Sequence, residues 1–244
     1  MRIALFGPQV EDIVDDITRH PEIELVDRRP DVVVCYGGDG TLLAAEQRWP
    51  FIPKVPIRNS RRGNRCIARP PGEVIERLLA DRLIRTEYMK LGGILRGPAH
   101  TEPGHGLNVM NEFNVHMARI TSAVRFKLWI DDESYGPDRE ILGDGFVIST
   151  PFGSMAYFNH ITRGFFHQGI GIAFKSTSEH TNHLVVPEYA VVRILITRGP
   201  AILAQDNSVE YLNLFEGDEL IVQRQEQSAV IFTWDAMRYP SDAF

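Results

Sequence analysis

Hydrophobic positions over residues 1–90 alternate between short β-type runs and helical spacing. Residues 31–36 are apolar throughout and rich in β-branched side chains, which predicts a strand buried on both faces of a parallel sheet. Residues 73–83 place apolar side chains on one side of an amphipathic helix. This alternation predicts an α/β domain, a Rossmann-like parallel sheet with flanking helices. The pattern also predicts strands over 1–7 and 22–26 and helices over 11–19 and 41–47.

The pattern changes near residue 90, where helical periodicity nearly disappears. β-rich runs split by Gly, Pro, Asp and Asn predict a mostly antiparallel β domain. We expect an α/β domain over 1–90 and a β-rich second domain over 91–244, whose last residues are candidates for packing back onto the first. Residues 95–106 predict a loop. The predicted β runs are 85–90, 108–118, 124–132, 145–150, 191–197, 201–205, 219–224 and 228–233.

Composition narrows the class of protein. The 244 residues are 43% apolar and 24% charged, as in ordinary globular proteins. The net charge of −6 argues against a general nucleic-acid binder, and apolar runs of about six residues are far short of the ~20 that a membrane helix needs. The two cysteines, Cys35 and Cys66, are too few for a disulfide framework. We therefore expect a cytoplasmic protein that binds neither nucleic acid nor membrane.

The segment 36–41 (YGGDGT) carries the most informative chemistry. It lies directly after the predicted buried strand and before a helix, where open α/β sheets bind ligands. Its glycines let a phosphate approach the backbone, and the helix N-terminus offers unpaired N–H groups. Asp39 would repel a phosphate unless it holds Mg²⁺ or takes a proton from an attacking hydroxyl, and both roles belong to phosphoryl transfer. The alternative interpretation is a tight turn in which Asp39 caps the helix.

Three segments, in order, resemble the NAD kinase family. Residues 37–41 (GGDGT) resemble a signature that NAD kinases share with diacylglycerol and sphingosine kinases. Residues 111–112 (NE) and 143–157 (GDGFVISTPFGSMAY) resemble two further motifs that are particular to NAD kinases. The resemblance implies an NAD kinase that transfers a phosphoryl group from ATP or polyphosphate to the 2′-hydroxyl of the adenosine ribose of NAD, giving NADP. It also implies Mg²⁺ or another divalent cation and a homo-oligomer, a dimer or a tetramer.

The resemblance assigns roles to individual residues. Asp39 would be the general base, and Asn111 and Glu112 would hold the adenosine ribose. Asp206 would close the nucleotide site. The other implied NAD contacts are Asp144, Ala156 and Tyr157, and the implied phosphate-binding residues are Gly37, Gly38, Gly40 and Thr41. No histidine or cysteine pattern has metal-ligand spacing.

Taken alone, several of these residues have simpler interpretations. The pair Asn111–Glu112 lies in an apolar run and is also typical of a strand end with one polar residue facing water. An isolated Tyr157 would favour core packing. Asp206 stands beside Asn207, a combination that is typical of a turn.

The chain also departs from the family pattern. Leu142 stands where the family has a basic residue, Met155 replaces a residue with a hydroxyl, and His160 replaces a small polar one. The segment 58–69 replaces a glycine-rich one, and its arginines would either bind the phosphates of ATP or polyphosphate or form an open, solvated loop. We favour the solvated loop. These arginines are Arg58, Arg61, Arg62, Arg65 and Arg69.

The sequence is also compatible with two other functions. The departures favour a catalytically inactive paralogue or sensor that binds NAD or NADP without turnover, whereas the retained Asp39 argues against it. A lipid kinase sharing GGDGT is a weaker alternative, because no membrane-binding amphipathic stretch is visible.

Overall fold

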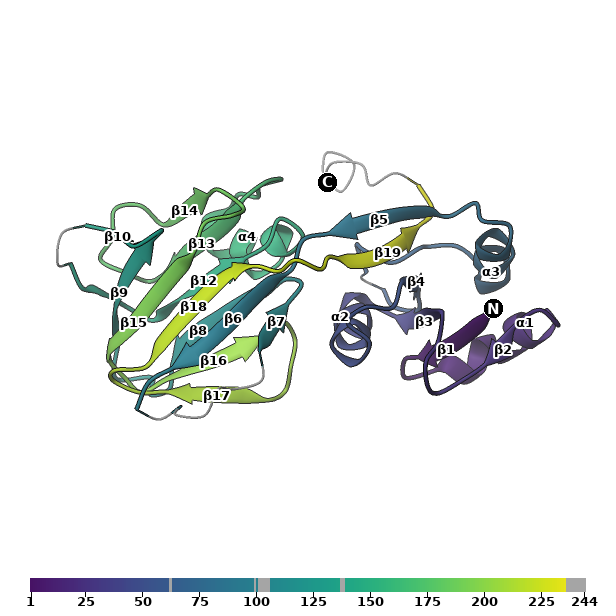
Figure 1. Ribbon diagram of the computed structural model, residues 1–244, viewed down its shortest axis with the longest axis horizontal. Coiled ribbons are helices and arrows are strands. Elements are labelled where there is room, and N and C mark those ends of the chain that lie inside the picture. Colours follow the sequence, from purple (N-terminus) through teal and green to yellow (C-terminus); the bar gives the residue numbers. More distant parts are fainter. Residues whose placement is uncertain (62, 99, 101–105, 137–138, 236–244) are drawn as a thin grey trace. The chain divides into compact units, whose positions relative to one another are not determined.

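The computed structural model describes residues 1–244 except 62, 99, 101–105, 137–138 and 236–244. Contacts divide the chain into two compact units (Figure 1). Unit 1 is Met1–Tyr88 together with the chain from Ser228 onward, and unit 2 is Met89–Gln227. The chain therefore passes into unit 2 after Tyr88 and returns to unit 1 at Ser228.

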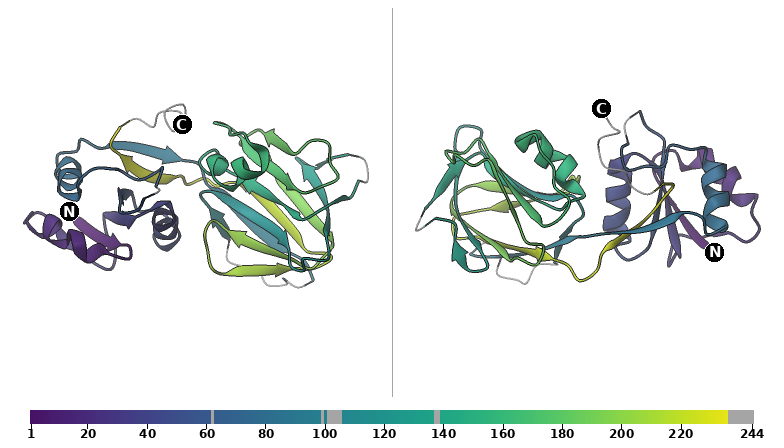
Figure 2. Two further views of the ribbon diagram at one scale, coloured as in Figure 1. Left: turned by 180° about the vertical axis from the view of Figure 1, so that it is seen from behind. Right: turned by 90° about the horizontal axis from the view of Figure 1, so that it is seen from above.

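Unit 1 is a sheet with helices on both faces (Figure 2). Its elements are β1 (Arg2–Phe6), the 3₁₀ helix η1 (Val10–Ile13), α1 (Val14–Thr18), β2 (Glu24–Leu25), β3 (Val32–Gly37), α2 (Asp39–Arg48), β4 (Lys54–Arg58), α3 (Pro71–Leu79), β5 (Ile84–Tyr88) and β19 (Ala229–Thr233). The strand order is β2-β1-β3-β4-β19-β5. Neighbours from β2 to β19 are parallel, and β5 is antiparallel to β19.

The strand β3 shows why this sequence forms a covered sheet. Residues 32–35 are all buried, because α1 and α3 pack on one face of the sheet and α2 contacts β3 and β4. A strand covered on both faces needs apolar side chains at successive positions. Helix α3 instead buries one stripe, Val74, Ile75 and Leu78, as its amphipathic pattern predicts.

Unit 2 consists of antiparallel sheets. Its elements are β6 (Leu91–Arg96), β7 (Leu107–Val109), β8 (Glu112–Met117), β9 (Val124–Ile130), β10 (Glu133–Ser134), β11 (Ile141–Gly143), β12 (Gly145–Ser149), the 3₁₀ helix η2 (Gly153–Met155), α4 (Tyr157–Thr162), β13 (Ile170–Lys175), β14 (His183–Val186), β15 (Val192–Arg198), β16 (Ala201–Gln205), β17 (Tyr211–Leu214) and β18 (Glu219–Arg224). One sheet has the order β10-β9-β15-β18-β6-β7, with β11 paired to β9. The other, called the β8 sheet below, has the order β14-β13-β12-β8-β16-β17.

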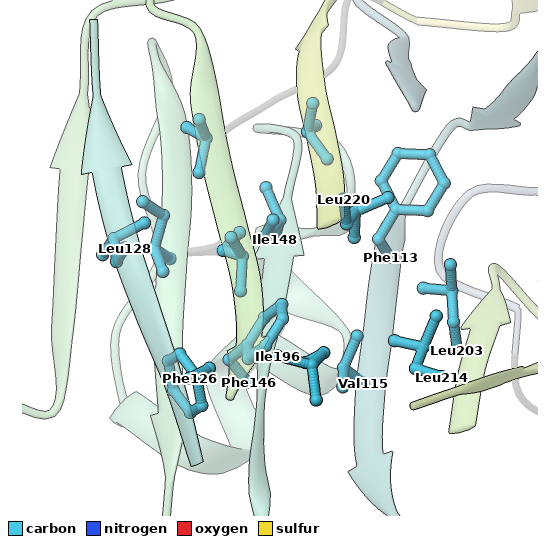
Figure 3. Packing of buried hydrophobic residues seen from close by; sticks show 14 of the residues in the cluster. Phe113, Val115, Phe126, Leu128, Phe146, Ile148, Ile196, Leu203, Leu214 and Leu220 are labelled. Carbon is cyan, nitrogen blue, oxygen red and sulfur yellow. The ribbon is translucent and has the colours of Figure 1, made fainter. Parts of the chain in front are cut away.

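The core of unit 2 lies between these two sheets. Phe113 and Val115 of β8 and Phe146 and Ile148 of β12 are fully buried there (Figure 3). Side chains alternate along a strand, so the residues between them lie on the opposite face of the β8 sheet.

That opposite face, called the outer face below, is covered in part by α4. Val147 of β12 and Ala173 of β13 pack there against Phe158 of α4. Glu112 and Asn114 of β8 alternate with core residues and so belong to the same outer face. The outer face therefore combines a small apolar cluster with polar side chains.

The predicted fold class, an α/β domain with a mostly antiparallel β domain, is confirmed. The prediction of one strand within 108–118 is wrong, because β7 ends at Val109 and β8 begins at Glu112. The strands that were not predicted are β4, β6, β10, β11, β13, β14 and β17. In β6 the reason is visible, since Gly92 and Gly93 weaken the strand signal. Part of the predicted loop 95–106 lies outside the described residues.

Candidate active site

Asp39 lies at the N-terminus of α2, immediately after β3. Gly38 is the N-cap residue, and Asp39 makes no capping hydrogen bond. The Asp39 carboxylate instead accepts hydrogen bonds from the backbone N–H of Asn64 (3.1 Å) and of Arg65 (2.9 Å). The Cys66 thiol lies 3.6 Å from the same carboxylate. The helix-cap interpretation is therefore wrong, and the loop at 64–66 orients this side chain.

The arginine segment 58–69 folds back onto the sheet. The Arg58 N–H donates to the Ile67 carbonyl oxygen (2.9 Å), and the Ile67 N–H donates to that of Pro56 (2.8 Å). Burial lowers the pKa of Arg65, and the Asp39 carboxylate opposes this. The prediction of an open loop is therefore wrong for its middle. The side chains of Arg58, Arg61 and Arg69 are exposed, and Arg62 lies outside the described residues.

The glycines next to Asp39 allow close backbone approach. A Cβ atom on Gly37 would lie 2.2 Å from Oγ1 of Thr41, so a side chain there would displace Thr41 in the first turn of α2. Gly40 and Thr41 line a cavity of about 530 Å³. Its other lining residues are Leu5, Phe6, Gly7, Pro8, Ala44 and Arg48. The cavity lies where β1 and β3 end and α2 begins, and N–H groups at such a helix start favour a phosphate.

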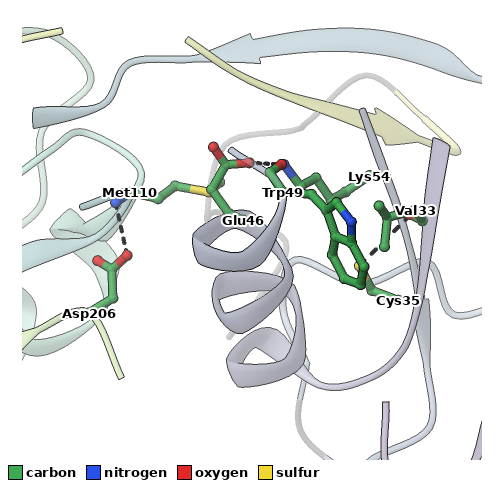
Figure 4. Close-up of polar contacts among 7 residues, drawn as sticks. All are labelled: Val33, Cys35, Glu46, Trp49, Lys54, Met110 and Asp206. Carbon is green, nitrogen blue, oxygen red and sulfur yellow. Dashed lines mark hydrogen bonds and ion pairs between the residues drawn. The ribbon is translucent and has the colours of Figure 1, made fainter. Parts of the chain in front are cut away.

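A buried ion pair fastens α2 to the sheet. The Lys54 ammonium on β4 donates to the Glu46 carboxylate on α2, and it also donates to the carbonyl oxygen of Trp49 at 2.5 Å (Figure 4). Both charged side chains are almost fully buried, and removing one would leave the other uncompensated. Burial also raises the pKa of Cys35 to about 12, so this thiol stays protonated.

In unit 2, Asp206 organises the turn between β7 and β8. Its carboxylate accepts hydrogen bonds from the N–H groups of Met110 (3.0 Å), Asn111 (2.7 Å) and Glu112 (3.1 Å); Figure 4 shows the first of these. The backbone at Asp206 has φ of 48°, a left-handed conformation that Asp tolerates better than most residues. The Asp206 carboxylate therefore helps to fix the backbone of Asn111 and Glu112.

Two residues of the segment 143–157, Thr150 and Gly153, contact the same turn. The Thr150 hydroxyl donates to the Met110 carbonyl oxygen (2.6 Å), and the Thr150 N–H donates to that of Asn111 (2.9 Å). A Cβ atom on Gly153 would lie 2.3 Å from the Asn111 oxygen. These contacts explain why a hydroxyl and a glycine stand at 150 and 153. The sequence predictions assigned neither residue a contact with this turn.

Glu112 is a buried carboxylate on the outer face. The residue is 7% exposed, and its Oε2 atom has no hydrogen-bond partner among the described residues. Burial and the neighbouring Asp206 raise the pKa of Glu112 to about 8, and Lys175 opposes the shift. Burial also raises the pKa of Asp206 to about 6, against the effect of its backbone hydrogen bonds. A buried oxygen without a partner is suited to a hydroxyl of a ligand.

A second cavity, of about 590 Å³, lies within unit 2. Asp144 and Tyr157 line it together, as do Lys175 and Glu179. Tyr157 is 36% exposed, so its interpretation as a core residue is wrong. Ala156 is the N-cap residue of α4. The remaining lining residues are His116, His160, Ile161, Phe174, Ser176, Thr177 and Asn182.

The sequence predictions missed Lys175 and Asn114. Lys175 ends the strand β13, which was not predicted although its run IGIAF is apolar. The signal available in the sequence was the single lysine at the end of this apolar run. Asn114 could have been noted as a second polar residue two positions after Glu112, on the same strand face.

The described residues include few side chains that could bind a metal ion. They contain no group of three or more His, Cys, Asp or Glu side chains that could hold one. Mg²⁺ commonly keeps waters and substrate phosphates as ligands and needs only one or two carboxylates. Asp39, next to the cavity at the start of α2, is the carboxylate that fits this role. Bound Mg²⁺ would neutralise charge on the phosphates.

Comparison with known proteins gives a consistent result. An NAD kinase of Nitrosospira multiformis is 27% identical over 240 residues, which cover 90% of this chain and 74% of that protein. NAD kinase 1 of Gloeobacter violaceus is 35% identical over 136 residues, covering 52% of this chain and 42% of the relative. No family model matches the chain.

Solved structures show the same fold at lower identity. Yeast NADH kinase complexed with NADH has a TM-score of 0.84 at 17% identity, covering 99% of this chain and 84% of that one. An NAD kinase from Archaeoglobus fulgidus in complex with ATP has a TM-score of 0.75 at 20% identity, covering 96% and 94%. None of the helices in the described part of the chain has the length and apolar character needed to span a membrane.

The fold and the relatives together define the class of protein: it is an enzyme of the kinase type, as the sequence predicted. More particularly, the resemblance to the NAD kinase family is confirmed by both sequence and fold.

Proposed function

We propose that this chain is an NAD kinase that transfers a phosphoryl group from ATP, or from polyphosphate, to the 2′-hydroxyl of the adenosine ribose of NAD. Asp39 accepts the proton of that hydroxyl as it attacks. Gly37, Gly38, Gly40 and Thr41 bind phosphates. Most of the rate comes from positioning and from neutralising charge, as in other phosphoryl transfers.

The residues of unit 2 bind the dinucleotide in this proposal. Asn111 and Glu112 hold the adenosine ribose, and Asp144, Ala156 and Tyr157 contact the rest of NAD. The buried, unpartnered Oε2 atom of Glu112 supports a role as acceptor for a ribose hydroxyl. A direct contact of Asp206 with NAD remains part of the proposal, beside its hydrogen bonds to the turn.

The setting of Asp39 is the observation that carries the proposal. Its carboxylate lies at the start of α2, and Gly40 and Thr41 of the same turn line a cavity. Two backbone N–H groups orient it without neutralising it. A general base needs this combination of a fixed direction and an available lone pair. A homo-oligomer, NADP as product and Mg²⁺ as the cation are further parts of the proposal.

The test is formation of NADP by the purified chain from NAD, ATP and Mg²⁺, read with an NADP-specific dehydrogenase. A 2′-phosphorylated product supports the proposal. No product, in spite of NAD binding measured by calorimetry, would favour the sensor instead. Replacing ATP by polyphosphate in the same assay settles the donor. Phosphorylation of diacylglycerol in micelles, with NAD ignored, would favour the lipid kinase.

A further inference from the structure

The register of the β8 sheet brings a lysine to the outer face level with His116, from where its side chain reaches Asn114, the neighbour of Glu112 on that face. Gly145 of β12 is paired with His116 of β8 on one side and with Lys175 of β13 on the other. Ala173, two residues before Lys175, belongs to the outer-face cluster, so Lys175 lies on that face too. The strand between β8 and β13 has no side chain at this position, because it carries Gly145. The long Lys175 side chain can therefore cross β12 toward β8.

Contacts hold the Lys175 ammonium in place on the outer face. The residue is 6% exposed. Its Nζ donates a hydrogen bond to Oδ1 of Asn114, which is two residues from Glu112 on the same face of β8. The same Nζ lies 5.3 Å from the ring centroid of Tyr157. No carboxylate of the described residues bonds this buried cation directly, and such burial costs free energy, which suggests a role beyond packing.

The surrounding charges define what this ammonium can do. Burial lowers the pKa of Lys175 to about 8, and Asp144 and Glu112 oppose the shift. Lys175 in turn opposes the rise in the pKa of Glu112. Each of these two groups therefore favours the charged form of the other. The other titratable groups near the cavity are His116, Asp144, Tyr157, His160 and Glu179, the last paired with Arg139 at 3.2 Å, and Asp206 faces Glu112 from the turn after β16.

We propose that Lys175 is a positioning residue for Glu112: it fixes the strand face through Asn114, and its charge favours the anionic form of Glu112 as an acceptor for a hydroxyl of the substrate. The proposal rests on the function proposed above, since it names the group that prepares Glu112 for the ribose. Lys175 itself acts through Glu112 and Asn114. No bond is formed or broken at the ammonium.

The first test compares Lys175→Met with Lys175→Arg. Removing the charge makes ionisation of Glu112 harder, so the acid limb of the pH profile of kcat/KM for NAD should move up by about one pH unit or more in Lys175→Met. At pH 7 kcat/KM should fall by about tenfold, and the loss should shrink as pH rises. Lys175→Arg should restore most of it. Lys127→Met, which removes a half-buried lysine from β9 of the opposite sheet, is the matched control and should leave the profile unchanged.

A second readout does not depend on turnover. The Glu112 carboxyl, followed by carbon-13 NMR in the protein without ligand and assigned with Glu112→Gln, should titrate at higher pH in Lys175→Met than in the wild type. If the wild type made no NADP but this shift appeared, the proposed function would fail and the coupling of Lys175 to Glu112 would stand. If kcat/KM fell by the same factor at every pH and the Glu112 titration did not move, Lys175 would be only structural. Should Lys175→Met fail to fold, Asn114→Ala must give a smaller shift in the same direction, and no shift would overturn the proposal.

Discussion

Unit 1 and unit 2 each contain an aspartate whose carboxylate accepts hydrogen bonds from backbone N–H groups, and the two arrangements differ in what they hold in place. Asp39 receives two hydrogen bonds, from Asn64 and Arg65, residues distant in sequence that close over it. Asp206 receives three, from the successive N–H groups of residues 110–112. In unit 1 the backbone orients a carboxylate, whereas in unit 2 a carboxylate shapes the backbone. The same kind of hydrogen bond therefore orients a side chain in unit 1 and shapes a turn in unit 2.

The largest expected effect is on the unit 1 carboxylate. Asp39→Asn removes the proposed proton acceptor but keeps one oxygen for the loop, so kcat for NADP formation should fall by about 10² to 10⁴. NAD affinity measured by calorimetry should change little. Asp15→Asn, at an exposed position of α1, is the control and should keep full activity. An Asp39→Asn variant that retained a tenth of the activity would break the assignment of the base.

The next effect concerns the turn that Asp206 shapes. Asp206→Ala leaves the N–H groups of residues 110–112 without their acceptor, and unfolding free energy should fall by about 2 to 4 kcal/mol. Asp131→Ala is a matched control, because Asp131 also has a left-handed backbone (φ 51°) and accepts one backbone hydrogen bond, from Val191. It should cost clearly less. Denaturation and hydrogen exchange of the 110–112 amides measure the difference, and equal losses would contradict the shaping role.

A third prediction concerns how the ionisation of Glu112 in unit 2 makes the unfolding free energy depend on pH. The pKa of Glu112 is raised from 4.5 to about 8, so the folded protein keeps this proton over a range where the unfolded chain has lost it. The stability that Glu112 contributes is therefore full below pH 4.5 and is lost as pH rises toward 8. Glu112→Gln should lose less stability over this range, by about 1 to 3 kcal/mol. Urea unfolding at the two pH values tests this, and parallel losses for both proteins would refute it.

The smallest effect is expected at the two cysteines. The Cys66 thiol, 3.6 Å from Asp39, is a weak donor beside two stronger backbone ones. Cys66→Ala should therefore change kcat by less than about threefold. Cys35→Ala, on the buried strand β3, should leave kcat unchanged and lower the unfolding free energy by about 1 kcal/mol. A large loss of kcat in Cys66→Ala would mean that the thiol orients Asp39.

Periodicity predicted those parts of the fold that depend on local pattern. The buried run at 31–36 became β3, and the amphipathic run at 73–83 became α3 with its last turn shortened. Strand β6 escaped prediction because Gly92 and Gly93 weaken the signal, and its place in the sheet depends on pairing with β18. Pairing between distant strands is not written in any short stretch of sequence.

The same limit applies to the candidate site. Motifs predicted which residues matter, and their roles as substrate contacts remain predictions. Motifs did not predict that Asp206 bonds the 110–112 turn or that Thr150 bonds Met110, because these contacts join residues far apart in the chain. They also did not single out Lys175, whose neighbours depend on the register of three strands.

The most direct measurement is kcat at saturating NAD for Asp39→Asn and Asp206→Asn, side by side with the wild type. Our account predicts that Asp39→Asn loses kcat by at least about 10². Asp206→Asn should keep kcat within about tenfold and instead weaken NAD affinity, because our proposal assigns Asp206 to binding and Asp39 to proton transfer. Equal losses of kcat in both variants, or a retained kcat in Asp39→Asn, would contradict the division between a chemical carboxylate and an architectural one.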